Sequence, residues 1–227
     1  GHIDLNTLGA NSGNDCWGWT DPATGKEYAL MGLNTGTSFI DISDLEFPRI
    51  VGFLPTHTTS SSWRDIKTYG NYAFIVSEAS NHGMQVFDLT RLTSVGSDVP
   101  PVTFTEDAHY NGFGKAHNIV INETQGYAYA VGTNTYSGGP HFVNISNPLN
   151  PVSEGGYGND AYSHDAQVVT YNGPDTDYTG KEILIGSNQN EVVIVDVTDK
   201  TNPTQIATIN YPNIGYTHQG WFTEDQS

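Results

Sequence analysis

Short apolar runs recur along the chain, and each is bounded by glycine, asparagine or aspartate. A compact run of this kind occurs four times, at 28–32, 72–76, 127–132 and 182–186. Short apolar runs between turn residues are typical of strands that are buried on both faces. Each compact run is followed by a run that alternates apolar and polar residues and ends in a polar turn, at 39–44, 86–90, 142–147 and 193–199. The pattern therefore predicts pairs of neighbouring strands joined by turns.

A polar pair introduces a further strand ahead of each compact run. The pair and its first strand residue recur as Asp15-Cys16-Trp17, Arg64-Asp65-Ile66, His117-Asn118-Ile119, His164-Asp165-Ala166 and His218-Gln219-Gly220. The leading residues have numbers 15, 64, 117, 164 and 218, so successive copies are 49, 53, 47 and 54 residues apart. Self-similarity at a period of about 50 residues indicates a repeat architecture.

A proline opens the last segment of each repeat. These prolines are Pro48, Pro101, Pro151 and Pro203, and each precedes a short β-prone stretch. Because proline cannot donate to a central ladder, these stretches are predicted to be outer, edge strands. Four strands in about 50 residues form the blade of a propeller. The sequence therefore predicts an all-β fold, a β-propeller of four-stranded blades with about four blades present and no amphipathic helix.

The predicted blades divide the chain into regular units. We expect one β-propeller domain, or a fragment of one, over residues 1–227, with blade units at about 14–60, 61–113, 114–160 and 161–213. Partial strands are predicted in the segments 1–13 and 214–227. Within them, residues 3–8 resemble an outer strand and residues 221–224 an inner strand. Because the two ends fall within blades, we expect the chain to be part of a larger propeller.

Composition excludes some partners. The chain has 8 Lys and Arg against 25 Asp and Glu, a formal charge of −17, which repels phosphate backbones. We therefore expect no nucleic-acid partner. No apolar run approaches the roughly 18 residues of a membrane span, so no direct membrane insertion is expected of this chain. Cys16 is the single cysteine, which excludes an intrachain disulfide.

The candidate chemistry lies in the repeat phrase. The first strands of propeller blades line a central channel, so the leading residues and their neighbours are predicted to lie at its mouth. Three imidazoles, of His117, His164 and His218, beside the carboxylate of Asp165 form a candidate site for Zn, Cu or Fe. The structural alternative is that these histidines, with Asn118, Asp165 and Gln219, hydrogen-bond between adjacent blades.

Arg64 and the turn carboxylates each allow two interpretations. The positive charge of Arg64 suits a bound anion, or it is neutralised internally by Asp15 or Asp65. Aspartates that end the alternating strands either build turns or supply oxygen ligands for calcium. They are Asp41, Asp44, Asp88, Asp196 and Asp199.

Other signals are few. Asn122 and Asn144 lie in Asn-x-Ser/Thr sequons and are candidates for glycosylation in a eukaryotic secretory pathway. No catalytic residue is assigned, because Gly-x-Ser-x-Gly is absent and Cys16 lacks a sequence-local partner that would activate its thiol.

Several stretches closely resemble the choice-of-anchor B family, whose members carry LVIVD repeats. The stretches are 14–22, 62–67, 82–89, 116–120 and 216–221, together with the Val-Ile-Val-Asp core at 193–196. The resemblance implies a β-propeller on an exported protein that is secreted or attached to the cell surface. It implies no catalytic activity.

Two functional hypotheses follow. The first is an exported, non-enzymatic β-propeller, extracellular or at the cell surface, that acts as a structural module or binds protein or glycan partners; its edges and faces also permit self-assembly. The second is a metal-dependent enzyme with a histidine-lined site at the channel mouth, similar at the level of the fold to selenium-binding methanethiol oxidases.

Overall fold

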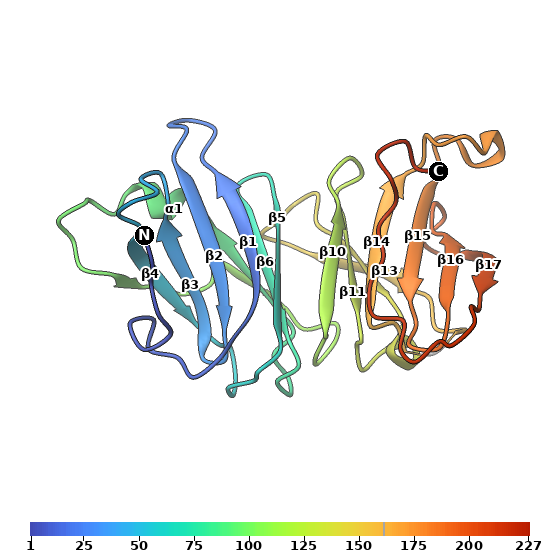
Figure 1. Ribbon diagram of the computed structural model, residues 1–227, viewed down its shortest axis with the longest axis horizontal. Helices are drawn as coiled ribbons and strands as arrows, with labels where there is room; N and C mark the ends of the chain where they lie inside the picture. Colours follow the sequence, from blue (N-terminus) through green and yellow to red (C-terminus); the bar gives the residue numbers. More distant parts are fainter. Residues whose placement is uncertain (161) are drawn as a thin grey trace. The chain divides into compact units, whose positions relative to one another are not determined.

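The computed structural model describes residues 1–160 and 162–227 and contains four β-sheets, each built on four antiparallel strands (Figure 1). The chain divides into two compact units, Gly1–Lys115 and Ala116–Ser227, each with two sheets. The prediction of an all-β fold of four-stranded blades is confirmed. The start of the fourth predicted blade unit, at residue 161, lies outside the described residues.

The first unit contains the first two sheets. The strands of the first are β1 (Gly13–Thr20), β2 (Glu27–Leu33), β3 (Gly36–Asp41) and β4 (Arg49–Pro55). The strands of the second are β5 (Arg64–Tyr69), β6 (Tyr72–Ser77), β7 (Met84–Asp88) and β9 (Ala108–Tyr110). The one-turn helix α1 (Thr90–Thr93) follows β7, and the short strand β8 (Val102–Thr103) precedes β9.

The second unit repeats this plan. The strands of the third sheet are β10 (Asn118–Asn122), β11 (Tyr127–Val131), β12 (His141–Asn144) and β13 (Val152–Gly156). The strands of the fourth are β14 (Asp165–Thr170), β15 (Glu182–Ser187), β16 (Val192–Asp196) and β17 (Thr204–Ile209). Two short 3-10 helices, η1 (Tyr136–Gly138) and η2 (Thr176–Tyr178), lie in connecting loops.

The core of each unit lies between its two sheets. In the first unit, Phe39 of β3 stacks on Phe87 of β7 at 4.6 Å between ring centroids. In the second unit, Tyr129 of β11 and Leu184 of β15 belong to one buried cluster. Because the second strands are buried on both faces, their sequences are almost continuously apolar, as predicted.

Neighbouring blades within a unit meet through their first strands. β1 contacts β5, and β10 contacts β14. In the first unit, Asp15 of β1 accepts a hydrogen bond from the backbone N–H of Ile66 at 3.0 Å. The side chain of Asp15 thus joins the first blade to the second.

The segment after Pro101 corrects one prediction. β8 does not form the outer strand of the second sheet; it pairs in parallel with β4 of the first sheet, and β9 takes the outer position beside β7. The backbone N–H of Phe104 continues the contact by donating to Phe53 at 2.8 Å. The aromatic ring of Phe104 also joins the core of the first unit, and this burial favours the pairing with β4.

The predicted terminal strands are also wrong. Residues 3–8 form turns, because the Asp4 side chain accepts from the backbone N–H of Thr7 at 2.7 Å and stabilises a local bend. Residues 221–224 form no strand either; the backbone N–H of Phe222 donates to the Gln167 side chain at 2.7 Å instead of to a neighbouring backbone. Within residues 1–160 and 162–227, no helix is long and apolar enough to cross a membrane.

Candidate functional site

The leading residues of the repeat phrase lie at equivalent points of the blades. Arg64 and Asp65 begin β5, Asn118 begins β10 and Asp165 begins β14. His117 and His164 each precede their strand by one residue, and Asp15 lies in β1. His218 and Gln219 follow β17 in the C-terminal segment. Apart from His218 and Gln219, the repeat residues therefore lie at or just before the first strand of the second, third and fourth sheets and within β1 of the first, and their convergence at one channel mouth stays a prediction.

In the second unit three imidazoles come together. The ring centroids of His117 and His164 are 4.3 Å apart, and those of His164 and His218 are also 4.3 Å apart. Nδ1 of the buried His164 lies 3.1 Å from the Tyr216 hydroxyl. Asp165 uses one carboxylate oxygen to accept from the backbone N–H of Ala166 at 2.7 Å. Metal binding by the three histidines stays a prediction.

In the first unit, Asp15 and Asp65 share a lysine. The ammonium of Lys67 lies 3.1 Å from Asp65 and 3.5 Å from Asp15, and it also lies over the Trp17 ring at 4.5 Å from the centroid. Lys67 and Asp65 are buried, so the pair is poorly screened by solvent. These two carboxylates are thus occupied by Lys67.

Arg64 is fully buried and has neutral partners. Its Nε donates to the Leu33 carbonyl at 3.0 Å, and its two terminal nitrogens contact Nε2 of His82 at 3.0 Å and the hydroxyl of Thr56 at 2.7 Å. Burial lowers the pKa of Arg64 to about 10, so the guanidinium is still charged at neutral pH. No ion pair joins Arg64 to a carboxylate in the part of the chain that the structure describes. The proposed neutralisation by Asp15 or Asp65 is therefore wrong.

His82 is the neutral partner of this cation. Burial, and secondarily the charge of Arg64, lower the pKa of His82 to about 3. Nδ1 of His82 donates to the carbonyl of Gly83 at 3.1 Å, so Nε2 is the nitrogen that accepts from Arg64. The geometry thus fixes both the charge and the tautomer of His82.

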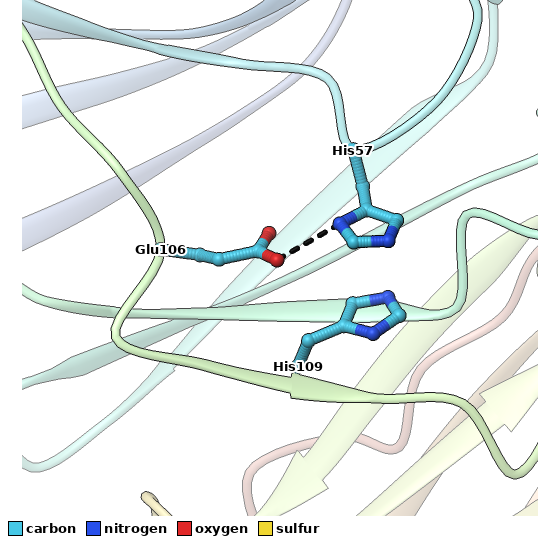
Figure 2. Close-up of side chains that lie close together, drawn as sticks. All are labelled: His57, Glu106 and His109. Carbon is cyan, nitrogen blue, oxygen red and sulfur yellow. Dashed lines mark hydrogen bonds and ion pairs between the residues drawn. The ribbon is translucent and has the colours of Figure 1, made fainter.

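A second histidine cluster consists of His57, Glu106 and His109 (Figure 2), and the ring centroid of His57 lies 6.3 Å from that of His82. Nδ1 of His57 lies 2.8 Å from a carboxylate oxygen of Glu106. The rings of His57 and His109 are stacked, with centroids 3.7 Å apart and planes 11° from parallel. One nitrogen or oxygen atom from each of the three side chains lies within 4.8 Å of the other two. Two imidazoles and a carboxylate form a donor set that suits first-row transition metals.

The cluster is assembled by the unpredicted pairing of β8 with β4. His57 follows the end of β4 by two residues, and Glu106 lies between β8 and β9. The parallel contact of the two strands brings Glu106 beside His57, while β9 carries His109. None of the three occupies the repeat phrase, so the repeat analysis missed them. The only local signal is the Glu-x-x-His spacing from Glu106 to His109.

Gln85 adds an unpaired oxygen to the same place. Its Nε2 donates to the Pro55 carbonyl at 3.0 Å and to Glu106 at 2.7 Å. Because both partners are acceptors, this orientation of the amide is fixed. Gln85 is 2% exposed, and among the described residues its Oε1 has no hydrogen-bond partner. A buried polar atom without a partner costs about 1–3 kcal/mol, so this oxygen calls for an explanation.

A surface pocket gives access to these groups. It has a volume of about 270 Å³ and is lined by His57, Gln85 and Glu106 together with apolar and hydroxyl side chains of the same unit. Leu54 and Phe104 supply part of the apolar wall. The site therefore combines a hydrogen-bonded His57–Glu106 pair, a stacked second imidazole and a free amide oxygen at one opening.

The sequon asparagines are engaged within their blades. The Asn122 side chain is buried, and its amide nitrogen donates to Glu182 at 2.8 Å. The Asn144 amide nitrogen donates to Glu154 at 2.8 Å. Because the amide of Asn122 is buried in the folded blade, it is not accessible for attachment of a glycan.

The turn aspartates act as turn residues. Asp88, Asp196 and Asp199 each accept a hydrogen bond from the backbone N–H two residues ahead, at 2.9–3.0 Å. Asp41 does the same for Ser43 at 3.1 Å. This is the Asx-turn pattern, so the fold itself accounts for the recurrence of these residues.

The comparisons agree with this architecture. Residues 62–89 and 180–210 match the LVIVD repeat; the first match covers β5, β6 and β7, and the second covers β15, β16 and β17. No curated protein matches the chain.

Two solved structures share the fold at low identity. A functionally unknown protein from Desulfotomaculum acetoxidans has a TM-score of 0.59 and 14% identity; the match covers 92% of this chain and 59% of that one. The hydrazine synthase of Kuenenia stuttgartiensis has a TM-score of 0.52 and 12% identity, with 79% and 46% covered. The chain thus spans about half the length of these structures, and the likeness shows the fold alone. The chain is an all-β protein built from propeller blades, and it carries LVIVD repeats.

Proposed function

We propose that the chain is an interaction module of an exported protein and binds a partner protein through the turn between β3 and β4. The LVIVD repeats and the regular blades support a structural or binding role. The observation that carries the proposal is the exposure of two large apolar side chains in that turn, Leu45 at 76% and Phe47 at 75%.

The turn does not need these side chains to fold. Asp44 accepts from the backbone N–H groups of Glu46 and Phe47 at 2.9 and 3.2 Å, which fixes the backbone. In the fourth blade the equivalent turn is built in the same way on Asp199, which accepts from the backbone of Thr201 at 2.9 Å. That turn has polar residues, Lys200, Thr201 and Asn202, where the first blade has Leu45, Glu46 and Phe47.

The charge around the turn defines the partner. Asp44 and Glu46 flank the two apolar residues, and the whole chain has a formal charge of −17. Such a surface complements a partner with an apolar depression bordered by lysine and arginine. A protein of this kind fits better than a neutral glycan, which offers no cationic groups.

Cross-linking followed by reconstitution tests this proposal. A photoreactive amino acid at position 47 would identify the partner on intact cells, and the purified partner would then be titrated with the chain. We expect Leu45→Ser combined with Phe47→Ser to weaken binding at least about tenfold. Leu149→Ser, at an exposed position in the corresponding turn of the third blade, is the matched control.

Two outcomes decide between the alternatives. Equal affinities of the double variant and the wild type would exclude this turn as the binding surface. Loss of binding after enzymatic removal of the partner's glycans would show that a glycan is recognised.

Export is supported by the resemblance to choice-of-anchor B proteins. It predicts that the full-length natural protein is found in the culture medium or is degraded when protease is added to intact cells. Recovery only from the cytosol would contradict this part of the proposal.

A metal-dependent enzyme is the second candidate function. The contacts of the His164 ring with those of His117 and His218 favour it, because three neighbouring imidazoles can hold Zn, Cu or Fe. Elemental analysis after expression with these metals tests it. Metal that is retained by wild type and lost in His117→Ala and His218→Ala would support this function, and metal-free wild-type protein would exclude it.

A further inference from the structure

We propose that His57, Glu106 and His109 bind a divalent first-row transition-metal ion at the mouth of the pocket beside β4. This site is separate from the three histidines of the second unit and does not depend on the binding turn at Leu45 and Phe47. Three observations carry it: the donor set, the tautomers of the two histidines, and the unpaired oxygen of Gln85.

The donor set is of the right kind. Two imidazoles and one carboxylate leave coordination positions open for water or a small ligand, as in mononuclear zinc and non-haem iron sites. The potential ligand atoms of the three side chains already lie within 4.8 Å of one another. Glu106 also supplies a negative charge that neutralises part of the charge of the ion.

The hydrogen bonds leave one nitrogen of each ring as an acceptor. Nε2 of His109 lies 2.7 Å from the backbone carbonyl of His82 and therefore donates to it, which leaves the lone pair on Nδ1. A backbone carbonyl that holds the second nitrogen of an imidazole is the usual support of a metal-binding histidine. Nδ1 of His57 donates to Glu106, which leaves the lone pair of this ring on Nε2; this hydrogen bond has to open before His57 and Glu106 can bind the same ion.

Metal entry requires one rearrangement. Because the two rings are stacked and 11° from parallel, their lone pairs run side by side rather than toward a common point. Ligand nitrogens must converge on an ion at about 2.0–2.1 Å. His57 is the ring that turns, since its side chain is 32% exposed and lies in the loop after β4. His109 stays in place on the carbonyl of His82.

Gln85 supports the site in two ways. Its Nε2 positions Glu106, while its buried Oε1 has no partner among the residues that the structure describes. A metal ion, or a water molecule bound to it, would give this oxygen the partner it lacks. Gln85 and two of the proposed ligands line the same 270 Å³ pocket, so an ion can reach the site from solvent.

Arg64 limits the affinity of the site. The guanidinium donates to Nε2 of His82, and the ring centroid of His82 is 6.3 Å from that of His57. A fixed positive charge on the far partner of His82 disfavours a second cation nearby, and Glu106 offsets it. The charge on Glu106 is therefore the feature on which binding should depend most.

The test is a titration of the whole chain with metal. The protein is stripped with a chelator, dialysed, and titrated separately with Zn²⁺ and Co²⁺ by calorimetry; the visible absorption of bound Co²⁺ reports its ligands. We expect a site whose affinity is weakened about 10–100-fold by His57→Ala and by Glu106→Gln, which keeps the shape of the side chain but removes its charge. Gln85→Leu, which removes the amide, should weaken it less.

Matched controls keep the result specific. His117→Ala and His218→Ala change the cluster of the second unit and should leave the affinity of the site at His57, Glu106 and His109 unchanged. Circular dichroism confirms that each variant is folded, which is expected for His57→Ala because the side chain is exposed in a loop. Absence of binding by the wild type, or binding that His57→Ala and Glu106→Gln leave unaltered, would overturn the proposal.

Discussion

The guanidinium of Arg64 donates a hydrogen bond to Nε2 of His82 at 3.0 Å, and both side chains are fully buried. A buried cation is here stabilised by a neutral imidazole, a hydroxyl and a carbonyl in place of a carboxylate. The arrangement holds together four segments of the first unit: the end of β2, the loop after β4, the start of β5 and the loop between β6 and β7.

This relationship predicts that Arg64→Met destabilises the protein. The change removes the desolvation cost of the charge but leaves Leu33, Thr56 and His82 without their donor and creates a cavity. We expect the lost hydrogen bonds and packing to dominate and the free energy of unfolding to fall by about 2–4 kcal/mol. Urea unfolding measures this, and Arg64→Lys, which keeps the charge but not the planar fork, is the comparison. An unchanged or increased stability of Arg64→Met would mean that the desolvation cost is larger.

Breaking the buried ion pair of Lys200 and Glu182 is predicted to destabilise the fourth blade. Lys200 lies 2.6 Å from Glu182, both are buried, and Glu182 also accepts from Asn122 of the third blade. Lys200→Met leaves the carboxylate of Glu182 without its cation, and we expect a loss of about 3–5 kcal/mol. Adding Glu182→Gln removes the isolated charge and should recover part of this loss. Equilibrium unfolding of the two single variants and the double variant gives the coupling energy.

His141 predicts a dependence of stability on pH. Burial lowers the pKa of His141 to about 4, and its ring nitrogens contact the hydroxyls of Thr135 and Ser153. In the unfolded chain a histidine titrates near 6.5, so the unfolded state binds the proton first as the pH falls. The contribution of His141 is thus complete above about pH 6.5 and is lost as the pH falls toward 4, on the order of 2–3 kcal/mol.

The variant His141→Gln isolates this contribution. It keeps hydrogen-bonding groups but does not titrate, so its stability should vary less than that of the wild type between pH 7 and pH 4. Thermal unfolding at several pH values measures the difference. Parallel pH profiles of the two proteins would show that His141 does not control acid stability.

A side chain at position 52 is predicted to disrupt the pairing of β8 with β4. A Cβ at this position of β4 would collide with the Phe104 ring and the Val102 carbonyl, so only glycine lets β8 pair with β4. Gly52→Val should displace β8, expose Phe104 and lower stability by about 1–3 kcal/mol. Hydrogen exchange of the Phe104 amide would report the lost pairing. Gly18→Ala is the matched control, because a Cβ there meets no atom within 4 Å.

The order of strands could be predicted because it depends on local patterning. Compact apolar runs such as 72–76 must be buried on both faces, and the turns after them contain glycine and asparagine that permit tight reversals. The repeat of about 50 residues then indicated that four such strands form one blade. The histidines at the start of β10 and β14 could be found in the same way, because equivalent repeat positions lie at equivalent places in the sheets.

The second histidine cluster could not be predicted, because its residues come from non-equivalent positions. Only the parallel pairing of β8 with β4 brings Glu106 beside His57, and that pairing depends on the absence of a side chain at Gly52 and on the burial of Phe104. The partner of Arg64 was missed for the same reason. From sequence, the expected partner of a buried arginine is a carboxylate. In the folded chain, Lys67 pairs with Asp15 and Asp65, and Arg64 contacts the neutral His82 instead.

The sequence by itself determined the repeating strands, the blades and the positions of His117 and His164 before their strands, since these follow from periodicity and turn chemistry within about 50 residues. The tertiary structure decided which charged groups pair, where β8 lies and which side chains share the pocket. Those features depend on contacts between distant segments, where packing around a glycine or a buried ring outweighs the local preference of the chain.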